Sequence, residues 1–281
     1  MSAQFEQSRE VKCITAVTPT ISKLLGVTPP TYSNANSIKD VIRAADRQGV
    51  ERVEKCLIYA PDAVGLQMFR KYSTLFDAVL ACAPVSVPLR SVIPPITPIC
   101  YASMFTGAQP QVHGIQKKEK PVLTCDTIFD ALIRSGKKIA VVAVKGSSID
   151  LIFRRRQMRY FSEPDDQEVT HRTLEVIKSD YFDFIVAYHS EYDDTLHEMT
   201  PFCPEAIEAL KHHIRAFSEF SKSMDVYWKK YHRMIWFAPD HGAHIDSQSG
   251  KGNHGDNDPK DMQVQHYIGI KPGEHDIPGS N

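Results

Sequence analysis

The chain has no excess of charge of either sign. Its 281 residues include 33 Lys and Arg against 34 Asp and Glu, which gives a formal net charge of −1. Nucleic acids and anionic membranes favour a basic surface, so this balance indicates neither of them as a partner.

Long hydrophobic runs and paired cysteines are also missing. No apolar run approaches the roughly 18 residues of a membrane span, and residues 1–9 are polar, unlike the apolar region of a signal peptide. The 6 cysteines contain no Cys-x-x-Cys pair, which disfavours a disulfide framework. Reduced thiols without an export signal predict a cytoplasmic location.

The composition is that of an ordinary globular protein, with 42% hydrophobic and 24% charged residues. The length is sufficient to bury a large core, and no internal repeat or low-complexity segment interrupts it. We therefore predict a single domain over residues 1–281, with short insertions and no large cap.

Apolar runs rich in β-formers alternate with amphipathic helical patterns. The predicted strands are 55–60, 138–144, 182–188 and 233–238, and the predicted helices are 37–48, 101–106, 127–135, 166–179 and 204–231. This alternation favours an α/β fold, a three-layer sandwich with a mostly parallel sheet covered on both faces. Ligands of such sheets bind beyond the carboxyl ends of the strands, where Asp62, Asp193 and Asp240 follow predicted strands.

The segment around Asp240 is the most informative one. Asp240-His241-Gly242 follows an apolar run, and His254, thirteen residues after His241 and next to Gly255, can fold back toward it. A carboxylate oxygen combined with imidazole nitrogens suits zinc or manganese.

Thr97 stands at a predicted helix start. Four prolines make the segment 85–98 extended or turn-like, and Pro98 suits the first helical position, which predicts Thr97 as the N-cap. A hydroxyl there lies at the positive end of a helix, an environment that favours an alkoxide and phosphate oxygens. The alternative is an ordinary capping threonine.

Asp193 and His197 are four residues apart, so they share one face if their segment is helical and could grip one ion. The alternative is a solvated acidic loop. Asp62 is a lone carboxylate at a strand end and indicates little by itself.

Taken together and in order, these segments resemble the alkaline phosphatase superfamily on its phosphodiesterase/nucleotide-pyrophosphatase side. Thr97 precedes Gly107 by ten residues, and the motifs that follow are Pro110-Gln-Val-His113-Gly114, Asp193…His197, Asp240-His241-Gly242 and Gly252-Asn-His254-Gly255. The resemblance implies an alkaline-phosphatase-like fold and a metal-dependent phosphohydrolase acting on small phosphodiesters or nucleotide pyrophosphates.

The same resemblance implies the roles of the residues. Two divalent ions would be bound, with zinc as the first choice and manganese as the alternative. One ion would be held by Asp193, His197 and His254. The other would be held by Asp62, Asp240 and His241. Thr97 would lie between them as the nucleophile, ligate metal through its oxygen and form a phospho-threonine intermediate.

The chain departs from the family pattern at two positions. Cys100 and Lys118 stand where relatives carry Asn, three and twenty-one residues after the nucleophile. Lys117 or Lys118 could supply positive charge to the substrate instead, and the alternative is that both are solvated. Cys82 lacks the spacing and the Arg of a sulfatase signature, so we expect a buried apolar role for it.

We expect the remaining His and Arg residues to have structural roles. We expect His113 to pack behind the nucleophile helix, and His212 and His213 to lie at the surface or edge of the long helix. Arg154, Arg155, Arg156 and Arg159 are expected on a solvated face. Two alternative functions remain open: hydrolysis of a small phosphonate such as phosphonoacetate, and non-catalytic metal binding.

Overall fold

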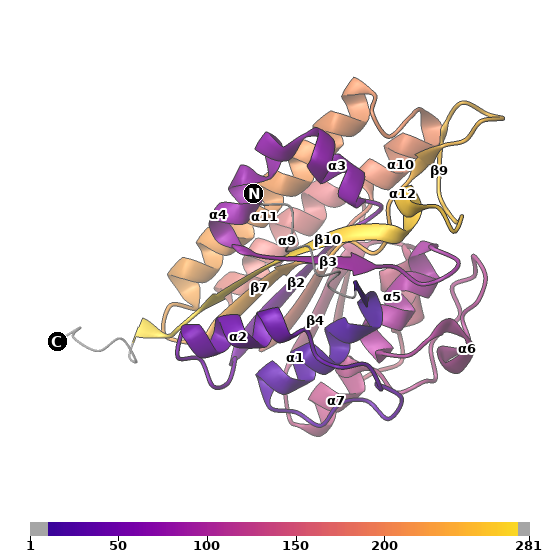
Figure 1. Cartoon of the computed structure of the whole chain (residues 1–281). Coiled ribbons are helices and arrows are strands. Elements are labelled where there is room, and N and C mark those ends of the chain that lie inside the picture. Colours follow the sequence, from indigo (N-terminus) through magenta and orange to yellow (C-terminus); the bar gives the residue numbers. More distant parts are fainter. Residues whose placement is uncertain (1–10, 275–281) are drawn as a thin grey trace, which may run out of the picture.

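An eight-stranded sheet forms the centre of the computed structural model, which describes residues 11–274 (Figure 1). Its strand order is β1-β3-β10-β7-β2-β6-β4-β5. The strands are β1 (Lys12–Cys13), β2 (Lys55–Pro61), β3 (Val85–Arg90), β4 (Ile139–Val144), β5 (Arg159–Glu163), β6 (Phe184–His189), β7 (Arg233–Phe237) and β10 (Gln263–Lys271). All neighbouring pairs are parallel except those of β10 with β3 and β7, which confirms the predicted mostly parallel sheet.

The four predicted strands β2, β4, β6 and β7 occupy the interior of the sheet. Their branched and aromatic residues are buried on both faces, as the near-continuous apolar runs predict. The apolar pattern does not predict β10, because Gln265 and His266 interrupt it. Both are buried with distant partners: Gln265 Nε2 donates to Ser86 Oγ at 2.6 Å, and His266 Nε2 lies 2.7 Å from the Pro239 carbonyl oxygen.

Helices cover both faces of this sheet and complete the three layers (Figure 1). One face packs on α1 (Val17–Leu25), α2 (Lys39–Arg47), α5 (Thr97–Thr106), α7 (Ile128–Arg134) and α8 (Ser148–Ile152). The other packs on α3 (Leu66–Lys71), α4 (Asp77–Cys82), α9 (Asp166–Lys178), α10 (Glu191–Glu198) and α11 (Pro204–Tyr227). The short elements are η1 (Ile14–Ala16), η2 (Ser73–Phe76), α6 (Pro110–His113), α12 (Pro259–Met262), β8 (His244–Ile245) and β9 (Gly252–Asn253).

The predicted helices all occur, with small differences at their ends. The long helix α11 ends at Tyr227 instead of residue 231, and Trp228 after it is fully buried, its Nε1 donating to the Ile177 carbonyl oxygen at 3.1 Å. Among residues 11–274, no helix combines the length and the apolar character that crossing a membrane requires. The single-domain prediction stays a prediction.

Arg156 corrects the expectation of a solvated arginine face. Its Nε lies 3.0 Å from both carboxylate oxygens of Asp130 in α7, and its Nη2 donates to the carbonyl oxygens of Leu123 and Cys125, each at 3.1 Å. Only 7% of the Arg156 side chain is exposed, whereas its neighbour Arg155 is exposed. The guanidinium therefore ties α7 to the segment that precedes it.

We predict that Arg156→Met lowers the free energy of unfolding by about 2 kcal/mol, because one carboxylate and two carbonyl oxygens lose their charged donor. The matched control Arg155→Met removes the same charge at the exposed neighbour and should change it by less than about 0.5 kcal/mol. Urea denaturation of both variants measures the difference. Equal stability of the two variants would contradict a structural role for Arg156.

Candidate functional site

The carboxyl ends of three adjacent central strands position most of the predicted site. Asp62 directly follows β2, Asp240 and His241 come shortly after β7, and α10 after β6 carries Asp193 and His197. Because β7, β2 and β6 are neighbours in the sheet, these side chains meet at one edge.

Two loops bring in the remaining residues. Thr97 opens α5, and His254 follows the hairpin of β8 and β9. The hairpin packs closely on α10, since a Cβ at Gly252 would lie 2.4 Å from the carbonyl oxygen of Leu196. Glycine at 252 therefore permits the approach that returns His254 to the sheet edge.

Asp62, Asp240 and His241 form the first group of donors. His241 Nε2 lies 3.4 Å from Asp62 Oδ1 and 3.3 Å from Asp240 Oδ2, and all three side chains are buried. His241 Nδ1 lies 2.9 Å from the carbonyl oxygen of Gly242, an acceptor for a ring N–H. The proton is therefore assigned to Nδ1, and Nε2 turns its lone pair toward the carboxylates.

Asp193, His197 and His254 form the second group. Asp193 Oδ1 lies 3.5 Å from Nε2 of each histidine, and the two Nε2 atoms are 3.1 Å apart. His197 Nδ1 faces the Gly252 carbonyl oxygen at 3.2 Å, and His254 Nδ1 faces the Pro95 carbonyl oxygen at 2.9 Å. Both Nδ1 atoms are thus the protonated ones, so two lone pairs point at each other.

The donor chemistry of both groups fits a divalent cation. Two lone pairs that face each other cannot form a hydrogen bond, and a cation between them removes the conflict. In addition, Asp193 Oδ1 and Asp240 Oδ2 are buried and have no hydrogen-bond partner within the described part of the chain. Oxygen and imidazole donors of this kind suit zinc or manganese.

The two groups adjoin each other, and Thr97 lies beside the first. The His241 and His254 rings stack with centroids 4.0 Å apart. Thr97 Oγ1 lies 3.2 Å from His241 Nε2 and 3.4 Å from Asp62 Oδ1. The hydroxyl therefore points into the donor set.

The structure corrects the helix position of Thr97. The cap of α5 is Ile96, with extended backbone angles of −127° and 133°, and Thr97 is the first helical residue. Its hydroxyl makes no capping hydrogen bond, which leaves the oxygen free to face Asp62 and His241.

The buried carboxyl groups have raised pKa values, a shift that a cation would reverse. Burial, then the charge of Asp240, raises the pKa of Asp193 to about 8. Burial and neighbouring carboxylates also raise the pKa of Asp62 and of Asp240. Burial lowers the pKa of His254 to about 4, so its imidazole is neutral at physiological pH. Carboxylates become far easier to ionise once positive charge lies among them.

Side chains that the sequence pattern does not single out support the site. Tyr188 donates its hydroxyl to Asp62 Oδ2. Ser91 Oγ donates to the Asp240 carbonyl oxygen at 2.7 Å and lies 3.0 Å from the buried Cys100 Sγ. Tyr188 is the last residue of a predicted strand, and Ser91 lies between prolines, so neither position carries a motif.

An open cleft of about 320 Å³ leads to Thr97. Its lining includes Lys118, Lys120 and Lys145, but not Lys117, which is exposed. Burial and then the charge of Lys118 lower the pKa of His197, so that charge lies close to the donors. The one sequence signal for Lys145 is its place directly after β4.

Other predicted positions have mixed outcomes. His113 packs behind α5, with its Nε2 2.9 Å from Ser103 Oγ, as expected. His212 is exposed and pairs with Glu191, whereas His213 is fully buried and contradicts the surface prediction. Cys82 is only half-buried, against the expectation of a buried role.

Comparison with solved structures identifies the same fold in two enzymes. Phosphonoacetate hydrolase from Sinorhizobium meliloti 1021, in complex with phosphonoformate, is 16% identical with a TM-score of 0.53, over 70% of this chain and 58% of that chain. An inactive form of murine ectonucleotide pyrophosphatase/phosphodiesterase 5, in complex with AMP, is 17% identical with a TM-score of 0.53, over 69% of this chain and 59% of that chain. The match therefore spans less than two thirds of either neighbour, and it shows the fold alone.

Sequence comparison gives the family. No curated protein matches the chain. The family model described as type I phosphodiesterase/nucleotide pyrophosphatase matches residues 67–244, more than half of the chain and a stretch that includes Thr97 and the Asp240-His241 pair. With the alkaline-phosphatase-like sheet around it, this match shows that the chain belongs to the type I phosphodiesterase/nucleotide pyrophosphatase family.

Proposed function

We propose that the protein is a two-metal hydrolase that cleaves phosphodiesters or nucleotide pyrophosphates through a phospho-threonine intermediate. The observation that supports it most is the pair of donor groups in which carboxylate oxygens and imidazole lone pairs converge, with the Thr97 hydroxyl beside one group. Family membership supports phosphoester hydrolysis in general.

In this proposal Asp193, His197 and His254 hold one divalent ion, zinc or manganese. Asp62, Asp240, His241 and Thr97 Oγ1 hold the other. When bound, such ions lower the pKa of a hydroxyl and offset the charge that develops on phosphoryl oxygens.

The chain's own residues orient the reaction. Thr97 Oγ1, fixed by Asp62 and His241 at the start of α5, attacks phosphorus after its proton passes to water in the open cleft. The new oxygen–phosphorus bond forms as the leaving oxygen departs with its electron pair. Water then breaks the Thr97 Oγ1–phosphorus bond, which releases the phosphate product and restores the hydroxyl.

Lys118 is the proposed substrate contact. It stands where relatives carry Asn and it lines the cleft beside Thr97, so its ammonium group would meet a phosphoryl oxygen of the substrate. Lys117 lies outside the cleft lining and is no longer proposed.

Two alternative functions would use the same site. Hydrolysis of a small phosphonate would use the same threonine, and the cleft lysines Lys118, Lys120 and Lys145 could pair with the second anionic group of such a substrate. The second alternative is a protein that binds metal at this site but catalyses no reaction. The proposed partner is a small phosphorylated or phosphonate substrate, and a cytoplasmic location remains part of the proposal.

The first test uses zinc- or manganese-loaded protein on bis-p-nitrophenyl phosphate, p-nitrophenyl phosphate, thymidine monophosphate p-nitrophenyl ester and phosphonoacetate. We expect preferential turnover of the diesters. Thr97→Ala and Asp240→Asn should both abolish it, the first by removing the nucleophile and the second by removing a ligand. Metal analysis should show a substantial loss only for Asp240→Asn.

The outcomes separate the alternatives. Turnover of phosphonoacetate alone would replace the diesterase proposal with carbon–phosphorus cleavage. Two bound metals without any turnover would support a non-catalytic module. Wild-type rates in Thr97→Ala would remove Thr97 from the nucleophile role.

Metal affinity should fall as the pH drops below about 8. Burial raises the pKa of Asp193 to about 8, so the metal-free protein holds a proton on this carboxyl at neutral pH. A cation must displace that proton to bind. At lower pH the carboxyl is protonated in a larger fraction of the molecules, so the affinity for metal is lower. Calorimetry in buffers of different ionisation enthalpy should detect proton release at pH 7, and an uptake that is independent of pH from 6 to 8 would contradict the assignment.

Lys118→Gln should lower kcat/KM for the preferred diester by about tenfold, which corresponds to one charge-assisted contact. The matched control Lys117→Gln removes the same charge from the adjacent residue outside the cleft and should retain the wild-type value. Steady-state kinetics at fixed ionic strength measures both. Equal losses in the two variants would point to a general charge effect and against a direct contact.

A further inference from the structure

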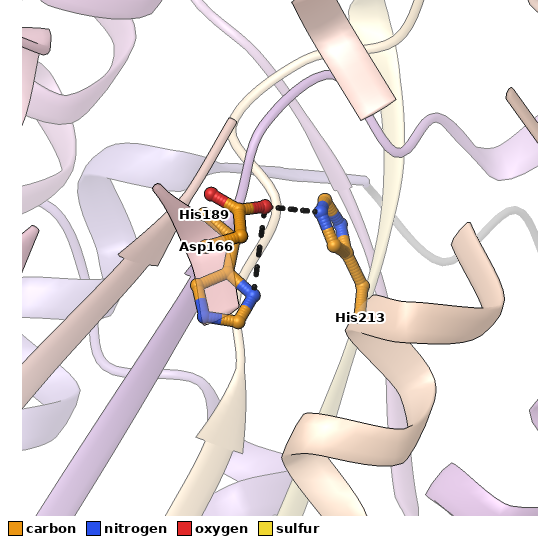
Figure 2. Close-up of side chains that lie close together, drawn as sticks. All are labelled: Asp166, His189 and His213. Atoms are coloured by element: carbon orange, nitrogen blue, oxygen red, sulfur yellow. Dashed lines mark hydrogen bonds and ion pairs between the residues drawn. The ribbon is translucent and has the colours of Figure 1, made fainter. Parts of the chain in front are cut away.

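A second group of buried polar side chains lies outside the candidate active site. Asp166 at the start of α9, His189 at the end of β6 and His213 in α11 converge from three elements (Figure 2). Asp166 Oδ2 lies 3.0 Å from His213 Nε2 and 3.8 Å from His189 Nδ1. None of the three residues is more than 9% exposed.

The hydrogens of His189 can be assigned from its neighbours. Thr170 Oγ1 donates to the Asp166 carbonyl oxygen at 2.9 Å, so it accepts from His189 Nε2 at 3.2 Å. His189 Nδ1 is then the acceptor for the Tyr59 hydroxyl, 2.8 Å away. Both ring nitrogens of His189 are satisfied by protein groups.

This pattern differs from that of the active-site histidines. In His197 and His254, Nδ1 faces a carbonyl oxygen and the two Nε2 lone pairs face each other. Here, the inward-facing nitrogens of His189 and His213 each face a hydrogen-bonding group, Tyr59 and Asp166 respectively. Although the three residues have ligand chemistry, the atoms that face one another already have hydrogen-bond partners without a cation, and only His213 Nδ1, which points away from Asp166, lacks one among the described residues.

The network ends on the helix that carries two proposed ligands. Asp166 Oδ1 accepts from the Ser190 backbone N–H at 2.9 Å, and Oδ2 accepts from that of Glu191 at 3.0 Å. These N–H groups open α10, where the Ser190 hydroxyl provides no cap because it donates to Asp194. A carboxylate from another helix therefore serves as the N-terminal cap of α10.

We propose that Asp166 is a positioning residue for the Asp193–His197–His254 group, which it orients by clamping the first turn of α10. The inference rests on the proposed function, since it concerns the affinity of that group for metal. Asp166 is not among the residues that line the cleft at Thr97.

The geometry of α10 explains why the clamp matters. The helix is only 8 residues long, and Asp193 and His197 lie in its first and second turns. A short helix has few bonds of its own to hold its start, so a shift there moves both side chains. His213 and the His189–Thr170 contact hold Asp166 and β6 in turn, which links the clamp to α11 and the sheet.

The Asp166 carboxyl is also held in its ionised form. Burial by itself raises the pKa of Asp166, but the hydrogen bonds from His213 Nε2 and from the Ser190 N–H favour the carboxylate, and the net pKa lies below its ordinary value. An ionised carboxylate is the form that the positive end of a helix favours.

The test is a competition titration of Zn²⁺ against a chromogenic chelator. We expect wild-type protein to bind two equivalents, and Asp166→Asn to weaken one of them by about tenfold or more while the other keeps its affinity. The amide removes the charge and can accept only one of the two N–H bonds. The matched control Asp165→Asn removes a charge from the adjacent exposed residue, which caps α9, a task that Asn performs equally well.

A second control distinguishes a selective effect on metal affinity from a general loss of stability. Phe129→Leu destabilises the core on the opposite face of the sheet, and it should leave both affinities unchanged even at equal loss of thermal stability. If Asp166→Asn does not fold, Tyr59→Phe removes one hydroxyl of the network at nearly constant volume and should weaken the same equivalent severalfold.

Three results would overturn the inference alone: unchanged Zn²⁺ affinities in both network variants, equal weakening of both equivalents, or a third wild-type equivalent that Asp166→Asn abolishes, which would make the network a metal site. Wild-type protein that takes up no Zn²⁺ would overturn the proposed function and this inference with it.

Discussion

The candidate active site depends on buried electron pairs that the protein does not satisfy by itself. Carboxylate oxygens of Asp193 and Asp240 have no hydrogen-bond partner among the described residues, and Nε2 atoms of His197 and His254 face each other at 3.1 Å. Leaving such groups buried costs free energy, and a folded chain retains them only where the surrounding structure enforces the arrangement. Bound cations would convert this cost into binding energy, so metal uptake and local stability should be coupled.

The central parallel strands provide that enforcement. β7, β2 and β6 end side by side, so three carboxylate-bearing segments are fixed by the sheet and need no long loops. Tyr188 and Ser91 add hydrogen bonds to Asp62 and to the Asp240 backbone. Glycine at 252 then lets the β8–β9 hairpin pack on α10 and deliver His254. The Thr97 hydroxyl comes from the opposite layer, at the first residue of α5.

α10 is the element on which these constraints meet. The hairpin packs along it near Leu196, and Asp166 caps its first turn from α9. The protein thus contains two kinds of Asp–His group with opposite requirements. Where Nδ1 faces a carbonyl oxygen, Nε2 is left free as the proposed ligand. Where the inward-facing nitrogen already has a hydrogen-bond partner, as in His189 and His213, the group is a hydrogen-bond network. Residue type and proximity alone do not distinguish the two.

The sequence by itself determined the features that depend on residues close together in the chain. The strands β2, β4, β6 and β7 follow from local periodicity, which each segment carries alone. The four-residue spacing of Asp193 and His197 permits one shared helical face, and the tertiary structure supplies the helix. Tertiary structure decided the rest: the strand β10 with its buried Gln265, the hydrogen bond from Tyr188, the approach of Lys145 to the cleft and the burial of His213. Gln265, Tyr188 and His213 are buried polar groups whose hydrogen-bond partners lie far away in the chain, and the energy of burying them depends on those partners, which no local pattern contains. Lys145 reaches the cleft because β4 ends beside the other central strands.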